Sequence, residues 1–375
     1  MNYQKRTIMT VCIAVVVAIV PAFLLVVCVD PFQIYHRPLI PGMGLQKNQR
    51  YQNAGLINSY LSDATQGYDS VIVGTSMSQN FTGEMVSKTL HWQKTLRLPM
   101  PGALADEQIA VLRHALDTGR VKHVLLEIHP FLYQDTYRQS KQESDLAVLY
   151  FPDFLYNDTL LDDAPYLFNV NVLKTSWKIL LHNFPAEPIT PETIGYWGDE
   201  KSMDSEHAEF NSSVNIEKLK AETSGFSLKA KNETEIDALR YPMFTNVLIP
   251  VLNESCNGNI EIVMFVPPWP RFRYQKSEKV TLRSVYMMRH ILKGITHCSN
   301  ISLYNFDLPD FAGDLNNYKD QQHYLPKINQ ELLDRIARQK NRLTLADVAS
   351  FENQFIDTIN HYTVYSSYAE AGKGK

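Results

Sequence analysis

Short, nearly continuous apolar segments that alternate with helix-like segments are the feature that most restricts the fold of this chain. The clearest is residues 123–128, in which Val124, Leu125, Leu126 and Ile128 are interrupted only by Glu127. A strand of this composition suits a sheet that is covered on both faces, whereas a half-exposed strand would alternate polar and apolar residues. The pattern therefore predicts an α/β protein.

The alternation recurs along most of the chain. Strands are expected at 70–74, 95–98, 123–128, 260–266 and 301–306, and helices at 83–90, 105–118, 235–252, 279–295 and 326–339. Strand–helix–strand connections between parallel strands are right-handed. These elements therefore predict a three-layer, doubly wound parallel sheet of the flavodoxin-like kind over residues 70–342. Residues 131–231 break the alternation, apart from a helical stretch near 172–181, and are predicted to be a large insertion that covers the active edge of the sheet. The tail, 343–375, has one amphipathic stretch and no assigned role.

The segment Thr7–Val29 contains no charged residue. As a helix it would be about 35 Å long, enough to cross a hydrocarbon core of about 30 Å, and Pro21 is tolerated in membrane helices. Lys5 and Arg6 precede it, so residues 1–29 are predicted to be a cytoplasmic stub and a single-pass anchor, with the rest of the chain outside the cytoplasm. A cleaved signal peptide is the alternative, but residues 25–28 lack the small side chains of a cleavage site. Residues 30–69, rich in turn formers, are predicted to be a stalk with a short helix near 56–61.

Charge and cysteine content bear on the binding partners and on the cellular compartment. The 375 residues carry a formal net charge of −4 and 45% hydrophobic residues, which suits a packed core and offers no basic surface for nucleic acid. Cys12 and Cys28 fall in the anchor. Cys256 and Cys298 each precede a predicted strand, at the same sheet edge, so a disulfide between them is expected in an oxidising compartment. Asn80 begins one of six Asn-x-Ser/Thr sequons in the chain, and a glycan there would obstruct the nearby Ser76. The sequons are therefore interpreted as coincidental, which fits the bacterial inner membrane and periplasm.

Ser76 is the first candidate for chemistry. It follows the strand 70–74 in the sequence Gly74-Thr75-Ser76-Met77 and precedes a helix, which places it at the carboxyl edge of a parallel sheet, where ligands bind. Its backbone N–H would point toward developing negative charge. The competing interpretation is a helix N-cap, a role for which Ser78 is the better candidate.

Asp320 and His323 are the second candidate pair. They follow the last predicted strand, and residues three apart in a compact turn can face each other, so that the carboxylate orients the imidazole. A surface histidine that caps a helix is the competing interpretation. Brought to Ser76, the pair would supply the base that a weakly nucleophilic hydroxyl needs.

Several other polar residues also fall at predicted strand ends. Gly102, after the second strand, is a candidate oxyanion donor, with a plain turn glycine as the alternative. His129 is a candidate for the pocket wall, whereas Glu127 is assigned to structure. Arg271 and Arg273 are candidates for binding an anionic or sugar substrate, with a solvated pair as the alternative. No histidine–cysteine motif predicts a metal, and no glycine-rich phosphate loop predicts a nucleotide cofactor.

These motifs resemble the SGNH (GDSL-like) hydrolase superfamily. Gly74-Thr75-Ser76 is similar to its first block, Gly102 to the oxyanion glycine of its second, and Asp320-x-x-His323 to its last; the resemblance covers residues 70–128 and 260–339. With the anchor, the order of the motifs is similar to that of envelope proteins that help D-alanylate teichoic acids and of polysaccharide O-acetyltransferase-like proteins. Two features differ from the family pattern. The first block reads Gly-Thr-Ser-Met instead of Gly-Asp-Ser-Leu, and no Gly-x-Asn-Asp block follows the third strand.

The resemblance implies an acyltransferase or esterase with Ser76 as nucleophile, His323 as base, Asp320 as orienter, and the Ser76 and Gly102 N–H groups as oxyanion donors. Its partner would be an acylated or acyl-accepting envelope glycan, with a membrane-embedded protein as a possible acyl donor and no cofactor. The alternative, which the missing block favours, is a non-catalytic envelope scaffold or glycan-binding protein with the same fold.

Overall fold

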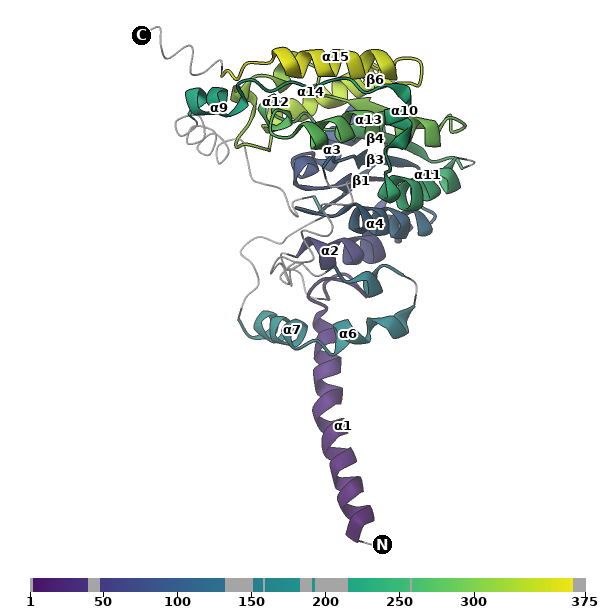
Figure 1. The fold of residues 1–375 in the computed structure, drawn as a ribbon. Helices are drawn as coiled ribbons and strands as arrows, with labels where there is room; N and C mark the ends of the chain where they lie inside the picture. The colour runs from purple at the N-terminus through teal and green to yellow at the C-terminus, as the bar shows by residue number, and fades with distance from the viewer. Residues whose placement is uncertain are drawn as a thin grey trace. The chain divides into compact units, whose positions relative to one another are not determined.

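The computed structural model describes residues 3–39, 48–131, 151–157, 159–182, 191–192, 215–256 and 258–366 (Figure 1). The chain divides into two compact units. One comprises Met1–Gly67 and Leu149–Ile194, and the other comprises Tyr68–Val148 and Gly195–Lys375.

The second unit is built on a six-stranded sheet with the order β2-β1-β3-β4-β5-β6. The strands are β1 (Ser70–Gly74), β2 (Thr95–Pro99), β3 (His123–Glu127), β4 (Glu261–Val266), β5 (Ile301–Asn305) and β6 (Arg342–Leu343). The first five are mutually parallel, and β6 pairs antiparallel with β5. Every residue of β1 and β2 is buried, as expected of strands covered on both faces. The predicted α/β class and parallel sheet are confirmed.

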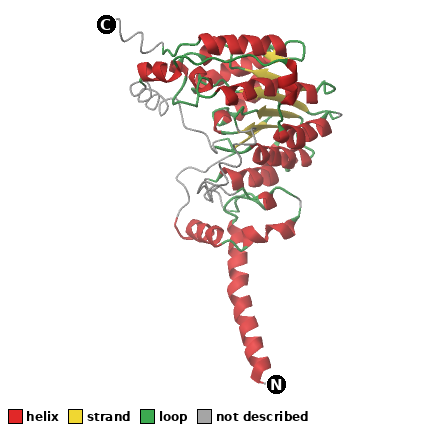
Figure 2. Ribbon diagram, viewed as in Figure 1, coloured by secondary structure: helices red, strands yellow, loops and turns green. Residues whose placement is uncertain are grey.

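Helices cover the two faces of this sheet (Figure 2). On one face, α3 (Gly83–Leu90) contacts α14 (Pro326–Ala337). On the other face, α4 (Ala105–Asp117) contacts the π-helical turn Phe244–Leu248, which continues into α11 (Ile249–Ser255). Helix α13 (Glu278–Gly294) follows on the same face, where its last residue, Gly294, touches Ile249. The strand order reverses at β1, so right-handed crossovers send α3 and α4 to opposite faces. Such a reversal opens a crevice at the carboxyl ends of β1 and β3.

One predicted helix is interrupted. Instead of one helix over 235–252, the chain forms α10 (Glu233–Ala238) and then, after a break, the π-helical turn and α11. The break falls at Leu239–Tyr241, directly before Pro242. Proline disfavours helical geometry in the residue that precedes it. The helix therefore stops before Pro242, although the apolar periodicity of the sequence continues through this segment.

The C-terminal tail is part of the second unit. Its helix α15 (Val348–His361) packs against α13, where Arg289 lies between the carboxylates of Glu352 and Glu233. Cys256 and Cys298, which precede β4 and β5, are joined by a disulfide with a Cα–Cα distance of 4.8 Å. Cys12 and Cys28 are free.

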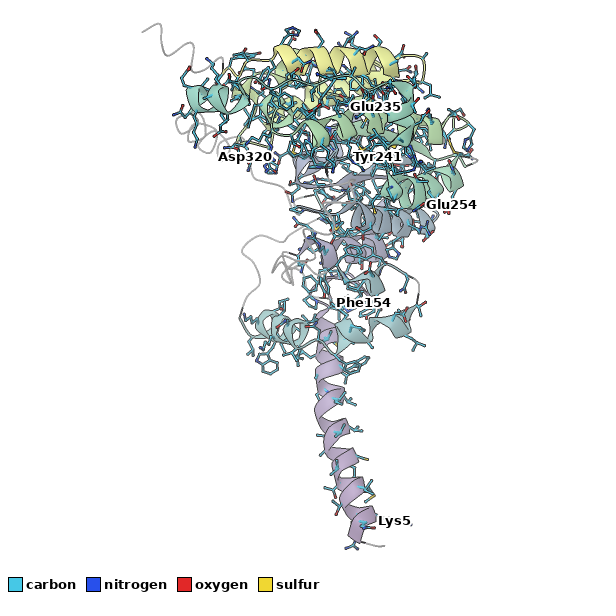
Figure 3. The ribbon with its side chains drawn as sticks, viewed as in Figure 1. Lys5, Phe154, Glu235, Tyr241, Glu254 and Asp320 are labelled. Atoms are coloured by element: carbon cyan, nitrogen blue, oxygen red, sulfur yellow. A yellow bond between two sulfur atoms is a disulfide. The ribbon has the colours of Figure 1, made fainter. Side chains whose placement is uncertain are left out.

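The first unit contains α1 (Tyr3–Val29), α2 (Gln49–Leu56), a π-helical turn at Ile57–Leu61, α6 (Ala164–Leu167) and α7 (Val170–His182). Within the described residues, α1 is the one helix long and apolar enough to cross a membrane, with a mean hydropathy of 3.2; a signal sequence has the same character. Figure 3 labels Lys5 near its beginning.

The segment predicted to be a stalk packs into this unit. Phe32, Ile34 and Ala54 form a buried cluster with Tyr166 and Val172. Residues 149–194, expected to belong to an insertion in the sheet domain, therefore group with 1–67. In the second unit, α9 (Ile216–Thr223) belongs to the same expected insertion. Residues 132–150, 183–190 and 193–214 of that insertion lie outside the described part of the chain.

Candidate active site

Ser76 lies at the tip of the turn that follows β1. It begins a short 3-10 turn, Ser76–Ser78, whose N-cap is Thr75: the Thr75 hydroxyl accepts from the N–H of Met77 at 3.2 Å. The following helix, α3, is capped by Thr82. Neither Ser76 nor Ser78 is therefore an N-cap. The Ser78 hydroxyl instead donates to the Thr75 carbonyl at 3.1 Å and is fully buried.

The structure brings Ser76, His323 and Asp320 together. The Ser76 Oγ lies 2.8 Å from the His323 Nε2, and the His323 Nδ1 lies 2.7 Å from the Asp320 Oδ2. The other carboxylate oxygen, Oδ1, accepts from the N–H groups of Gln322 at 2.7 Å and His323 at 2.8 Å. Asp320 is labelled in Figure 3. A hydroxyl, an imidazole and a carboxylate in this order have the arrangement of a nucleophile, its base and the group that orients the base.

Electrostatics keep the Asp320 carboxyl ionised. Burial alone would raise its pKa, but the hydrogen bond and charge of His323 and the two backbone N–H groups lower the pKa below its ordinary value. The Asp320 side chain is 42% exposed and that of His323 is 21% exposed, so solvent still reaches the pair. An ionised carboxylate at Nδ1 holds the proton there and leaves Nε2 as the acceptor that faces Ser76.

The Glu127 side chain stabilises the turn that carries Ser76. Its carboxylate accepts from the Thr75 N–H at 2.8 Å and from the Thr75 hydroxyl at 2.6 Å. The side chain is completely buried, and burial raises the pKa of its carboxyl against the opposing effect of the Thr75 and Ser78 hydrogen bonds. A Cβ at Gly74 would lie 2.6 Å from the Glu127 Oε2 and 2.3 Å from the Ser78 Oγ, so only glycine fits there.

Tyr324 ties the histidine loop to the serine turn. Its hydroxyl donates to the Met77 carbonyl at 2.6 Å, one residue beyond Ser76. Tyr324 also forms a bridge with Tyr318, and the Lys319 N–H donates to the His323 carbonyl at 2.9 Å. These backbone contacts, at Met77 after Ser76 and at His323 itself, hold the imidazole beside the Ser76 hydroxyl.

A cavity of about 360 Å³ opens beside Ser76. Gly102 lines it with a φ of +60°, a left-handed conformation that favours glycine. The Met100 N–H donates to the Gly74 carbonyl at 2.8 Å and so holds the loop of Gly102 beside the end of β1. The lining residues are Thr75, Ser76, Gly102, His129, Phe131, Trp269, Arg273, Lys276, Ser277, Val280 and Gln322.

His129 belongs to an aromatic wall of this cavity. Its Nδ1 accepts from the Phe131 N–H at 3.2 Å, and its ring meets the Trp269 ring edge-on at 4.7 Å. Trp269 is held in turn by Asp307, whose carboxylate accepts from the backbone N–H of Trp269 at 3.2 Å and from the Tyr274 hydroxyl at 2.9 Å. Burial raises the pKa of Asp307 to about 7.

The two candidate arginines have different positions. Arg273 lines the cavity and lies over the Trp269 ring at 5.7 Å. Arg271 is buried and donates to the carbonyls of Leu308 and Pro309, at 2.6 and 3.0 Å. Arg271 was a candidate for substrate binding, but its guanidinium is occupied by backbone acceptors and it does not line the cavity; of the two arginines, Arg273 is the one that lines it.

Three supporting residues went unassigned in the sequence analysis: Thr75, Tyr324 and Asp307. Glu127 was assigned to structure without a partner. An isolated acid in an otherwise apolar strand is itself a signal, since a buried carboxylate requires donors. Thr75, Tyr324 and Asp307 carry no comparable local pattern, because they lie outside the strands and helices, where a polar side chain is ordinary.

Comparison with known proteins finds no family model and no curated protein that matches this chain.

Proposed function

We propose that this protein is a membrane-anchored, serine-dependent enzyme of the SGNH type that transfers or removes an acyl group on a cell-envelope or exopolysaccharide glycan. The observation that carries the proposal is the 2.8 Å contact between the Ser76 Oγ and the His323 Nε2, with Asp320 bound to the opposite ring nitrogen. Ser76 also lines an open cavity, so an acyl group could reach it.

The residues suggest a two-step reaction. The Ser76 oxygen attacks the acyl carbonyl while the His323 Nε2 takes its proton, and Asp320 stabilises the resulting imidazolium. The oxyanion of the tetrahedral intermediate would accept from the N–H groups of Ser76 and Gly102. Collapse breaks the bond to the leaving alcohol, which takes the proton from His323 and leaves an acyl ester on Ser76. Water or a glycan hydroxyl then attacks this ester while His323 again removes a proton. The second tetrahedral intermediate collapses with cleavage of the bond to the Ser76 Oγ, which takes the proton back from His323 and releases the free acid or the acylated glycan.

The cavity favours a glycan as one of the two substrates. The Phe131 ring, backed by the buried Trp269, offers an apolar surface of the kind that packs against the C–H groups of a sugar, and Arg273 and Lys276 offer donors to its oxygens. The apolar helix α1 would hold the enzyme beside membrane-bound polymer and beside a membrane-embedded acyl donor, with the site outside the cytoplasm.

Covalent labelling tests the proposal. A fluorophosphonate probe, applied to the full-length protein, should form an adduct that tandem mass spectrometry places on Ser76. Ser76→Ala and His323→Ala should lose the adduct, whereas Ser350→Ala, an exposed serine of α15, should keep it. An unlabelled wild-type protein with a normal circular dichroism spectrum would contradict the proposal.

A non-catalytic envelope scaffold or glycan-binding protein is the second candidate. It is favoured by the segment after β3, which is His129-Pro130-Phe131 where the resemblance would require the third block. This alternative expects Ser76→Ala and His323→Ala to complement a deletion strain fully, whereas the enzyme proposal expects loss of complementation at normal protein levels.

A further inference from the structure

Helix α7 exposes an apolar face to solvent. Val172, Ser176 and Ile179 are buried and form its packed face. Four other apolar side chains are exposed: Val170 at 61%, Trp177 at 53%, Leu180 at 49% and Leu181 at 50%. At 3.6 residues per turn these four fall within an arc of about 100°, next to the packed face and distinct from it.

The third face of α7 is polar. Asn171, Lys174 and Lys178 are exposed and, by the same spacing, follow one another along the side that borders the apolar arc. A helix with one exposed apolar face bordered by lysines has the composition of helices that lie in the surface of a membrane.

Three more apolar side chains are exposed on the segment that precedes α7. Leu160 is 74% exposed, Leu161 87% and Phe168 58%, all on the segment that leads into α7. Single exposed leucines are ordinary, but apolar side chains gathered on one segment of 22 or so residues mark an interaction surface. We call Leu160, Leu161, Phe168 and the four exposed apolar residues of α7 the apolar collar.

The collar lies beside the last turns of α1. Ile179 of α7 packs against Val29 and Leu25 of α1, and the rings of Phe168 and Phe23 stack with centroids 6.1 Å apart. In Figure 1, α6 and α7 flank this end of α1. The preceding turns of α1 expose their apolar side chains, from Ile8 to Leu24. The collar is therefore continuous with the lipid-compatible surface of α1, at the point where that surface ends.

We propose that the apolar collar inserts into the outer leaflet of the bilayer that α1 crosses. Its partner is a phospholipid surface: the apolar arc of α7 would lie among the upper acyl chains, and Lys174 and Lys178 would reach the phosphate groups. This second attachment fixes the tilt and rotation of the anchor, which a single helix leaves free. The inference does not depend on the chemistry of Ser76.

Trp177 provides the test. The full-length protein is reconstituted in vesicles of phosphatidylcholine and phosphatidylglycerol, with or without bromine atoms on the upper part of the acyl chains. α1 contains no tryptophan, so emission that depends on Trp177 reports on the collar. Bromine should quench a component of the emission that is absent from Trp177→Phe and retained in Trp92→Phe, whose tryptophan is buried in the second unit. Equal quenching of wild type and Trp177→Phe would overturn the proposal, because Trp177 would then not lie among the acyl chains.

A matched pair of charge substitutions sharpens the result. Leu181→Glu places a charge on the apolar arc and should reduce the quenching of Trp177 and shift its emission to longer wavelength. Asn171→Glu places the same charge on the polar face and should leave both unchanged. Both positions are exposed, so an unchanged circular dichroism spectrum is expected of each variant. Identical behaviour of the two variants would also overturn the proposal.

Discussion

The Glu127 carboxylate accepts two hydrogen bonds from Thr75, the residue directly before Ser76, at 2.8 Å from its N–H and 2.6 Å from its hydroxyl. The last residue of β3 thereby holds the turn after β1. Because Gly74 removes the side chain that would block this approach, the glycine, the threonine and the acid act as one support for the nucleophile.

Substitution of Glu127 tests this support. Glu127→Ala leaves a buried cavity and an unpaired Thr75 N–H, and should lower the free energy of unfolding by about 3 kcal/mol. Glu127→Gln keeps the shape and an acceptor oxygen, and should remain within about 1 kcal/mol of wild type. Chemical unfolding followed by circular dichroism measures both. Equal destabilisation by the two variants would mean that the carboxylate charge, and not its hydrogen bonds, supports the turn.

Asp320→Asn should disable the base without removing it. The amide would present an N–H to the His323 Nδ1, which would then accept and leave the proton on Nε2, where it faces Ser76. The rate of fluorophosphonate labelling should fall by roughly 10⁴-fold, as expected for a triad locked in the wrong tautomer. Labelling at the wild-type rate would show that Asp320 does not orient the imidazole.

Substitution of Arg271 should affect the stability of the protein, whereas substitution of Arg273 should affect substrate binding. Arg271→Ala leaves the carbonyls of Leu308 and Pro309 without their donor, and should lower the free energy of unfolding by about 2 kcal/mol. Arg273→Ala should change it by no more than about 0.5 kcal/mol, while slowing turnover of anionic esters relative to neutral ones. The reverse pattern, with stability lost only in Arg273→Ala, would contradict the assignment.

Asp307 should make stability depend on pH. Its pKa is raised to about 7 in the folded protein, whereas an unfolded aspartate titrates near 3.9. The folded state therefore binds more protons between these values, so the free energy of unfolding should fall as the pH rises from about 4 to 7, by up to about 4 kcal/mol. Asp307→Asn removes this contribution, and its destabilisation relative to wild type should be smaller at pH 8 than at pH 5. Parallel pH profiles for the two proteins would refute the prediction. Urea unfolding at several pH values provides the measurement.

Much of the fold can be predicted from local sequence patterns. The apolar run at 123–128 predicted a strand buried on both faces, and β3 is such a strand. The positions of Ser76 after β1 and of Asp320 and His323 after β5 followed from the same alternation, because the carboxyl ends of parallel strands share one edge of a sheet. The spacing of Asp320 and His323 is local as well: residues three apart in a turn can bond without help from elsewhere.

The hydrogen-bond partner of each polar side chain depended on segments far apart in the chain. The sequence leaves Arg271 and Arg273 equivalent, yet one is bound by the carbonyls of a loop after β5 and the other lines the cavity. Thr75, and not Ser76 or Ser78, caps the serine turn, and residues 149–194 group with 1–67 and not with the sheet. Apolar periodicity reports which face of an element is buried, a property of neighbouring residues. Hydrogen-bond partners depend on which carbonyls and charges other loops bring near, and these are set only when the chain has packed.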